Sequence, residues 1–81
     1  MKASEFQEAV NEYTRAIELN EAEPASYSNR AMAYLKLKNY ARCIEDADKA
    51  IKLKPDYVKA YHRRGKAYLA CNKLDLAIRD F

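Results

Sequence analysis

Residues that interrupt helices are scarce in this chain of 81 residues, which has one glycine and two prolines. The β-branched residues that favour strands are also sparse, whereas Ala, Leu, Lys, Glu and Arg are abundant. This composition predicts an all-α fold and argues against a sheet. The length suffices for one small domain.

Cysteine is nearly absent too, and Cys43 and Cys71 are too few for a disulfide framework. Each lies within an apolar helical pattern, where a reduced cysteine packs as a small hydrophobic residue. This usage is typical of a reducing compartment. The sequence has no apolar run long enough to span a membrane, and its acidic start is not typical of a signal peptide. We therefore expect a cytoplasmic protein without a membrane partner.

The patterns that carry catalysis are missing as well. There is no glycine-rich phosphate loop, no Ser/His/Asp set and no zinc spacing. His62 is the single histidine, and no cysteine or acidic residue accompanies it at metal-ligand spacing. We therefore expect no enzyme activity, no cofactor and no metal site.

Charge is present but uneven. Residues 1–23 carry two basic and six acidic side chains, whereas residues 24–81 carry thirteen basic and six acidic ones. The basic part favours an acidic partner. Nucleic acid is one such partner, but the basic residues are interspersed with Asp and Glu, and the tyrosines are needed for packing. We expect no nucleic-acid partner.

The sequence repeats at an offset of 34 residues, which predicts a helical repeat array. The aligned pairs include Tyr27 with Tyr61, Arg30 with Arg64, Ala33 with Ala67, Tyr34 with Tyr68, Ile44 with Ile78, Asp46 with Asp80, and Ile17 with Ile51. The tyrosines 27 and 34, like 61 and 68, share one helical face, which predicts core packing. Small residues are expected where helices approach closely, namely at Ala31, Cys43, Gly65 and Ala77.

This repeat resembles the tetratricopeptide pattern over the whole chain. The second unit has Tyr27, Arg30, Ala31, Tyr34, Cys43, Ala47, Ala50 and Pro55, the third has Tyr61, Arg64, Gly65, Tyr68, Ala77 and Phe81, and the first keeps Ala9, Tyr13 and Ala16. Arg30 and Arg64 depart from the Leu of the pattern, and Ala47 departs from its Phe. The resemblance implies a tetratricopeptide-type α-solenoid of antiparallel helix pairs, with about two and a half repeats.

Five helices are expected, over residues 4–19, 24–37, 40–53, 57–71 and 73–81. The residues expected at their starts are a Ser4–Gln7 capping box, Pro24, Asn39, Asp56 and Asn72.

In this register, residues 1–23 are the second helix of a first repeat, 24–57 a second repeat and 58–81 an incomplete third. The first helix of the first repeat is therefore missing. Repeat arrays need solvating terminal helices, so we expect either a piece of a longer protein or ends covered by another chain. The exposed edge is expected at Leu74, Ile78 and Phe81, and the terminal helices are candidates for homo-oligomer formation.

Three polar side chains are the candidate binding site. Asn29 and Arg63 occupy the same position of successive repeats, and Lys59 lies one turn before Arg63. Together they offer an amide, a planar fork and a compact charge as hydrogen-bond donors. Such donors suit a carboxylate, for which the C-terminus of a peptide is a known partner.

The strings Tyr27–Ala31 and Lys59–Gly65 look like the carboxylate-clamp subset of tetratricopeptide domains. That subset belongs to co-chaperones, which bind Glu-Glu-Val-Asp C-termini of cytosolic heat-shock chaperones. Its clamp has five positions, of which Asn29, Lys59 and Arg63 match three, and the other two belong to the missing first helix. The resemblance implies a chaperone adaptor with a partial clamp. The alternative is a generic scaffold or self-associating fragment in which the clamp is idle.

Overall fold

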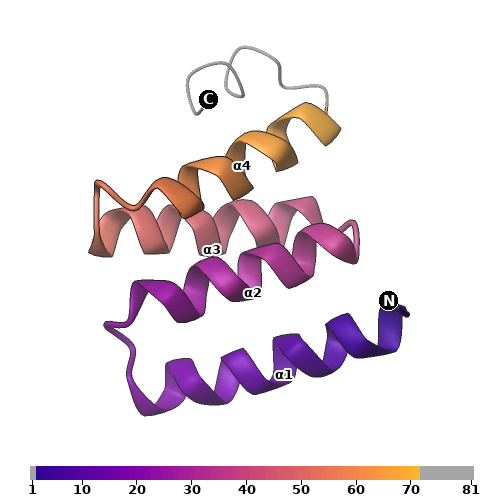
Figure 1. Ribbon diagram of the computed structural model, residues 1–81, viewed down its shortest axis with the longest axis horizontal. Helices are drawn as coiled ribbons and strands as arrows, with labels where there is room; N and C mark the ends of the chain where they lie inside the picture. The colour runs from indigo at the N-terminus through magenta and orange to yellow at the C-terminus, as the bar shows by residue number, and fades with distance from the viewer. Residues whose placement is uncertain (1, 72–81) are drawn as a thin grey trace.

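The computed structural model describes residues 2–71, which form four α-helices in antiparallel succession (Figure 1). They are α1 (Ala3–Leu19), α2 (Pro24–Lys36), α3 (Tyr40–Leu53) and α4 (Val58–Ala70). The all-α prediction is confirmed for these residues, and each of the four expected helices begins and ends within one residue of its predicted bounds. The fifth expected helix over 73–81, with the Asn72 cap, the close approach at Ala77 and the exposed edge at Leu74, Ile78 and Phe81, lies outside the described residues.

Two of the predicted helix starts are confirmed. Pro24 is the first residue of α2, where an absent N–H costs no hydrogen bond, and the Glu23 carboxylate accepts from the backbone N–H of Ala25 at 3.1 Å. Asn39 caps α3, since its side-chain oxygen accepts from the backbone N–H of Arg42 at 3.3 Å.

Two other predicted starts are wrong. Lys2 is the N-cap of α1, so Ser4 already lies inside the helix, and Gln7 donates instead to the Asn11 side chain at 3.2 Å. Tyr57, and not Asp56, is the N-cap of α4, and it makes no side-chain capping bond. At both starts, backbone bonds take over part of the capping: the N–H of Glu5 donates to Lys2 and that of Ala60 to Tyr57.

The helices pack through small residues, as predicted. One core cluster contains the fully buried Ala31, Cys43, Ala47 and Ala67, with Tyr34, Leu35, Tyr40 and Ile44 packed around them. The other contains Ile17, Tyr27, Ala50 and Ala60. Gly65 is also buried, and the Cys43 thiol lies 3.8 Å from the Arg63 carbonyl oxygen, to which it donates between α3 and α4. These small side chains let the helix axes approach closely.

The contacts between helices follow the repeat. Helix α2 contacts α1, α3 and α4, and α3 also contacts α4. Among the helices of residues 2–71, α1 contacts α2 alone. Helix α2 therefore packs against both α3 and α4, whereas no described helix packs in the equivalent way against both α1 and α2. The result is a thin layer, with principal extents of 34 × 29 × 16 Å.

Candidate functional site

The three predicted site residues lie on two helices that contact each other. Asn29 is on α2, Lys59 and Arg63 are on α4, and α2 contacts α4 directly. Lys59 is exposed, while Asn29 and Arg63 are half-buried. Their convergence on one ligand stays a prediction, but the two helices that bear them are neighbours, as the repeat register requires.

Arg63 is distinguished by what it does not bind. Among residues 2–71, its buried Nε–H has no hydrogen-bond partner, and no carboxylate forms an ion pair with its guanidinium. An unsatisfied buried donor costs about 1–3 kcal/mol, so an arginine in this state is favourably placed to gain an acceptor. In the same part of the chain, the Ser28 hydroxyl, next to Asn29, is also buried without a partner.

The next arginine in the sequence is used differently. Arg64 donates through its Nη1 to the Asp48 carboxylate at 2.6 Å. Its guanidinium also lies 5.4 Å from the centre of the Tyr61 ring and 5.9 Å from that of Tyr68, at cation–π distance. Arg64 is thus part of the packing between α3 and α4.

Arg30 shows the same arrangement one repeat earlier. It donates two bonds of 2.7 Å to the Asp46 carboxylate and one of 3.1 Å to the Thr14 hydroxyl. Its guanidinium lies 5.9 Å from the Tyr27 ring centre and 6.0 Å from that of Tyr34. The bond to Asp46 raises the pKa of Arg30 above its already high ordinary value, despite the opposing effect of burial.

The prediction of core packing is confirmed for Tyr27 and Tyr34, and it did not include the arginine that lies between the two tyrosines of each repeat. Tyr27 is buried, and its hydroxyl donates to the Glu21 carbonyl at 3.0 Å. Tyr61, one repeat later, donates to the Pro55 carbonyl at 2.8 Å. The stacking of Arg30 and Arg64 on tyrosines could have been predicted from the sequence. Each of these arginines lies three residues after one tyrosine and four residues before the next, on the same helical face.

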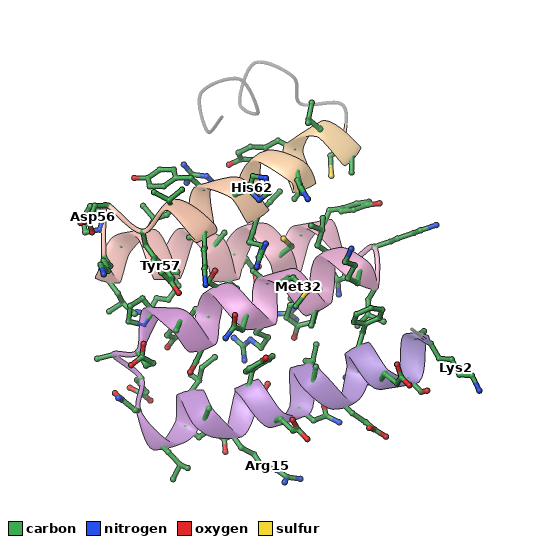
Figure 2. The ribbon with its side chains drawn as sticks, in the orientation of Figure 1. Lys2, Arg15, Met32, Asp56, Tyr57 and His62 are labelled. Atoms are coloured by element: carbon green, nitrogen blue, oxygen red, sulfur yellow. The ribbon has the colours of Figure 1, made fainter. Side chains whose placement is uncertain are left out.

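No side chain in the described part of the chain is arranged for covalent or metal chemistry. Burial raises the pKa of the Cys43 thiol to about 12, which keeps it protonated and unreactive at neutral pH. No three metal-ligating side chains gather within residues 2–71, and His62 is exposed on α4 (Figure 2). None of the described helices is both long and apolar enough to cross a bilayer.

Comparison with family models agrees with the repeat. Two models described as "Tetratricopeptide repeat" match residues 24–57 and 47–79, and one described as "TPR repeat" matches residues 1–38. The 24–57 match coincides with the predicted second repeat.

This chain matches only a small part of the length of two curated relatives. Human serine/threonine-protein phosphatase 5 is 39% identical over 99% of this chain, which covers 16% of the phosphatase. The Hsp70/Hsp90 co-chaperone CNS1 of Saccharomyces cerevisiae is 43% identical over 94% of this chain, which covers 21% of that protein. The catalytic domain of the phosphatase lies outside the matched part.

Two solved structures with bound peptides resemble this chain. The second TPR of Spaghetti (RPAP3) bound to the HSP90 peptide SRMEEVD has a TM-score of 0.91 and 41% identity, over 94% of this chain and 70% of that one. The second TPR domain of human RPAP3 in complex with the HSP70 peptide SGPTIEEVD has a TM-score of 0.89 and 39% identity, over 95% of this chain and 64% of that one.

Proposed function

The chain belongs to the tetratricopeptide repeat family, and from this we propose that it binds acidic C-terminal peptides of heat-shock chaperones, of the Glu-Glu-Val-Asp type. The peptide carboxylates accept hydrogen bonds from Asn29, Lys59 and Arg63. The relatives with bound EEVD peptides support the ligand class, and the basic balance of residues 24–81 supports its charge. We propose a binding module rather than an enzyme, with the cytoplasmic address that these partners require.

The observation that carries this proposal is the contrast between Arg63 and Arg64. Both belong to α4, but Arg64 is bound to Asp48, whereas the buried Nε–H of Arg63 lacks an acceptor within the described residues. A terminal carboxylate has the two acceptor oxygens that a guanidinium fork prefers. Binding would thus supply the carboxylate partner that the Arg63 guanidinium lacks among residues 2–71.

Residues 1–81 on their own should bind weakly, because they supply three of the five clamp positions that the resemblance implies. The resemblance assigns two further donors to a helix before α1. Each hydrogen bond to a charged group contributes about 1.5–3 kcal/mol, so losing two lowers the affinity by about a hundredfold or more. Interaction between exposed charges is also screened by salt, so the affinity should fall as ionic strength rises.

A pair of peptides tests the proposal. A peptide ending in Glu-Glu-Val-Asp is titrated against the chain, in parallel with the same peptide amidated at its C-terminus. We expect the free acid to bind at least about tenfold more tightly, because amidation removes the charge that the clamp recognises. Equal affinities for the two peptides would refute the proposal and favour the idle clamp of a generic scaffold.

Self-association is the second candidate, and exposed apolar side chains favour it. Leu19 is 89% exposed and Val58 is 76% exposed, and these two lie near opposite ends of the described array. Sedimentation over a range of concentrations tests it, since a monomer at every concentration would remove this candidate.

A further inference from the structure

Two of the turns between helices lie at the same edge of the molecule. The chain passes from α1 to α2 and from α3 to α4 at this edge, whereas it passes from α2 to α3 at the opposite one (Figure 1). We call residues 18–24 the first turn, residues 52–58 the second turn, and the two together the turn edge. The two segments are equivalent in the 34-residue repeat.

Exposed apolar side chains gather at the turn edge. Four large apolar side chains are exposed within residues 2–71, and three of them belong to the two turns. Leu19 is 89% exposed, Leu53, at the same repeat position, is 37% exposed, and Val58 is 76% exposed. The fourth, Leu69, lies near the end of α4, at the opposite edge. Exposed apolar side chains are ordinary when scattered singly, but here each turn presents one at the same place.

The two turns carry opposite charges. The first contains three acidic and no basic side chains, whereas the second contains two basic side chains and one acidic one. These residues are Glu18, Glu21 and Glu23 in the first turn, and Lys52, Lys54 and Asp56 in the second. Glu18 and Lys52 occupy the same repeat position, and both are exposed. The turn edge therefore presents two similar surfaces of opposite sign.

These charges are not paired with one another. No side chain of either turn forms an ion pair within residues 2–71. Glu23 caps α2, and the Lys54 ammonium lies 5.7 Å from the centre of the Tyr57 ring. Glu18 and Lys52, by contrast, extend from the last turns of α1 and α3 as exposed charges. Each of them suits a partner of opposite charge.

A second copy of the chain supplies such a partner at both turns. In a two-fold dimer, the surface that meets its own copy must be self-complementary. An axis midway between the two turns brings the first turn of each copy to the second turn of the other. Because the turns are related by the repeat, this arrangement sets Leu19 against Leu53 and Val58 of the other copy. It also sets Glu18 against Lys52, twice in each dimer.

We propose that the turn edge is a dimerisation surface, through which two copies of the chain pair about a two-fold axis. This dimer rests on self-association, the second candidate above, and it names the surface, the symmetry and the paired residues. It is independent of the carboxylate clamp, because the turn edge includes none of Asn29, Lys59 and Arg63. The smallest extent of the molecule is 16 Å, so the edge is narrow and the dimer is weak and reversible.

An exchange of charges tests the pairing. One variant, Glu18→Lys with Glu21→Lys, makes both turns basic, and another, Lys52→Glu with Lys54→Glu, makes both turns acidic. Sedimentation equilibrium at several concentrations measures the dimer of the unmodified chain. Each variant alone should dimerise about tenfold more weakly or worse, because like charges then meet at both contacts. An equimolar mixture should recover a dimer with one copy of each variant, because opposite charges meet again.

Two matched controls separate the turn edge from the rest of the surface. Glu5→Lys with Glu8→Lys changes the net charge as the first variant does, but in the first half of α1, away from the turn edge. It should leave dimerisation within about twofold of the original at moderate salt. Leu19→Ser should weaken the dimer about tenfold, whereas Leu69→Ser should change it by less than about twofold.

Four outcomes would overturn the proposal. The first is a monomer at every concentration, and the second is an assembly that grows beyond the dimer, which a closed two-fold pairing forbids. The third is a dimer that the Glu5/Glu8 control weakens as much as the turn variants do. The fourth is a mixture of the two turn variants that stays monomeric while circular dichroism shows both folded.

The results also separate this dimer from the other proposals. A dimer that neither turn variant weakens would leave self-association standing and assign it to another face, such as the terminal helices. A failure of Glu-Glu-Val-Asp peptides to bind would affect only the clamp, because the dimer is measured without peptide.

Discussion

Arg30 and Asp46 face each other across α2 and α3, joined by two hydrogen bonds of 2.7 Å. The same guanidinium also reaches Thr14 on α1, so one side chain connects three helices. One repeat later, Arg64 binds Asp48, which occupies the repeat position of Thr14. Both arginines stand where the family pattern has leucine, and both connect neighbouring helices through a charged pair.

We expect Arg30→Ala to destabilise the fold strongly. It leaves the Asp46 carboxylate, 6% exposed, without its partner, and breaking a buried pair in this way costs about 3 kcal/mol or more. Urea unfolding followed by circular dichroism measures the change. The control is Arg42→Ala, whose pair with Glu45 is about two-thirds exposed on both sides and contributes at most about 0.5 kcal/mol.

The double variant Arg30→Leu with Asp46→Leu sharpens this prediction. Removing both charges leaves no unpaired buried group, so its stability should lie close to that of the unmodified chain. If the double variant is as unstable as Arg30→Ala, the loss of stability does not come from an unpaired Asp46. The hydrogen bond of Arg30 to Thr14, or its stacking on the tyrosines, then provides most of the stabilisation.

The features that the sequence could predict are those determined by residues close together in the chain. The 34-residue repeat and the helical pattern placed four helices to within one residue, because helix periodicity is carried by the residues of the helix itself. The caps failed at Ser4 and Asp56, because a cap depends on which residue begins the helix, and that boundary shifts by one residue at little cost.

The contact between the two helices that bear the proposed site could be predicted for the same reason. The repeat register assigned Asn29 and Arg63 to matching positions on adjacent helices, and the contact between α2 and α4 agrees with this. The isolation of the Arg63 Nε–H could not be predicted, since it depends on where the neighbouring acceptors lie in space.

We expect Arg63→Gln to separate binding from folding. Affinity for a Glu-Glu-Val-Asp peptide should fall about tenfold or more, because a charge-assisted fork is replaced by a neutral amide. The midpoint of urea unfolding should stay unchanged or rise, since the substitution removes a buried donor that has no acceptor. Lys52→Gln, which also removes one charge but from the exposed part of α3, should leave the affinity nearly unchanged at moderate salt.

An equal loss of affinity for the Arg63→Gln and Lys52→Gln variants would contradict the assigned site. It would indicate that the chain attracts acidic peptides through its overall charge, without a defined carboxylate position.

The two cysteines should differ in reactivity. Cys43 is fully buried and its thiol pKa is raised to about 12, whereas Cys71 is half-buried. At pH 8, a thiol reagent should therefore modify Cys71 quickly and Cys43 only when the chain opens. Single Cys→Ala variants assign the two rates, and equal rates in folded protein would contradict the burial of Cys43.

The pKa of Cys43 also predicts a pH dependence of stability. Its folded value lies above the ordinary value of 9.0, so the stabilisation is complete below about pH 9 and is lost as the pH rises toward 12. The decrease from this one group amounts to at most about 1.4 kcal/mol per pH unit. Cys43→Ala should remove this component when urea unfolding is measured at several pH values from 8 to 11. A pH dependence identical in the variant would assign the decrease to other groups.

A final prediction concerns the turn between α2 and α3. Lys38 has a φ of 62°, in the left-handed region, and follows the C-cap residue Leu37. The N–H of Asn39 donates to the Tyr34 carbonyl at 2.9 Å and that of Lys38 to Leu35 at 3.0 Å, the two bonds of a Schellman motif. Glycine adopts this conformation without the steric cost that a Cβ imposes, so Lys38→Gly should stabilise the chain by about 0.5–1 kcal/mol. The control, Lys36→Gly in the last turn of α2, should destabilise it, and a loss of stability for both variants would contradict the left-handed conformation of Lys38.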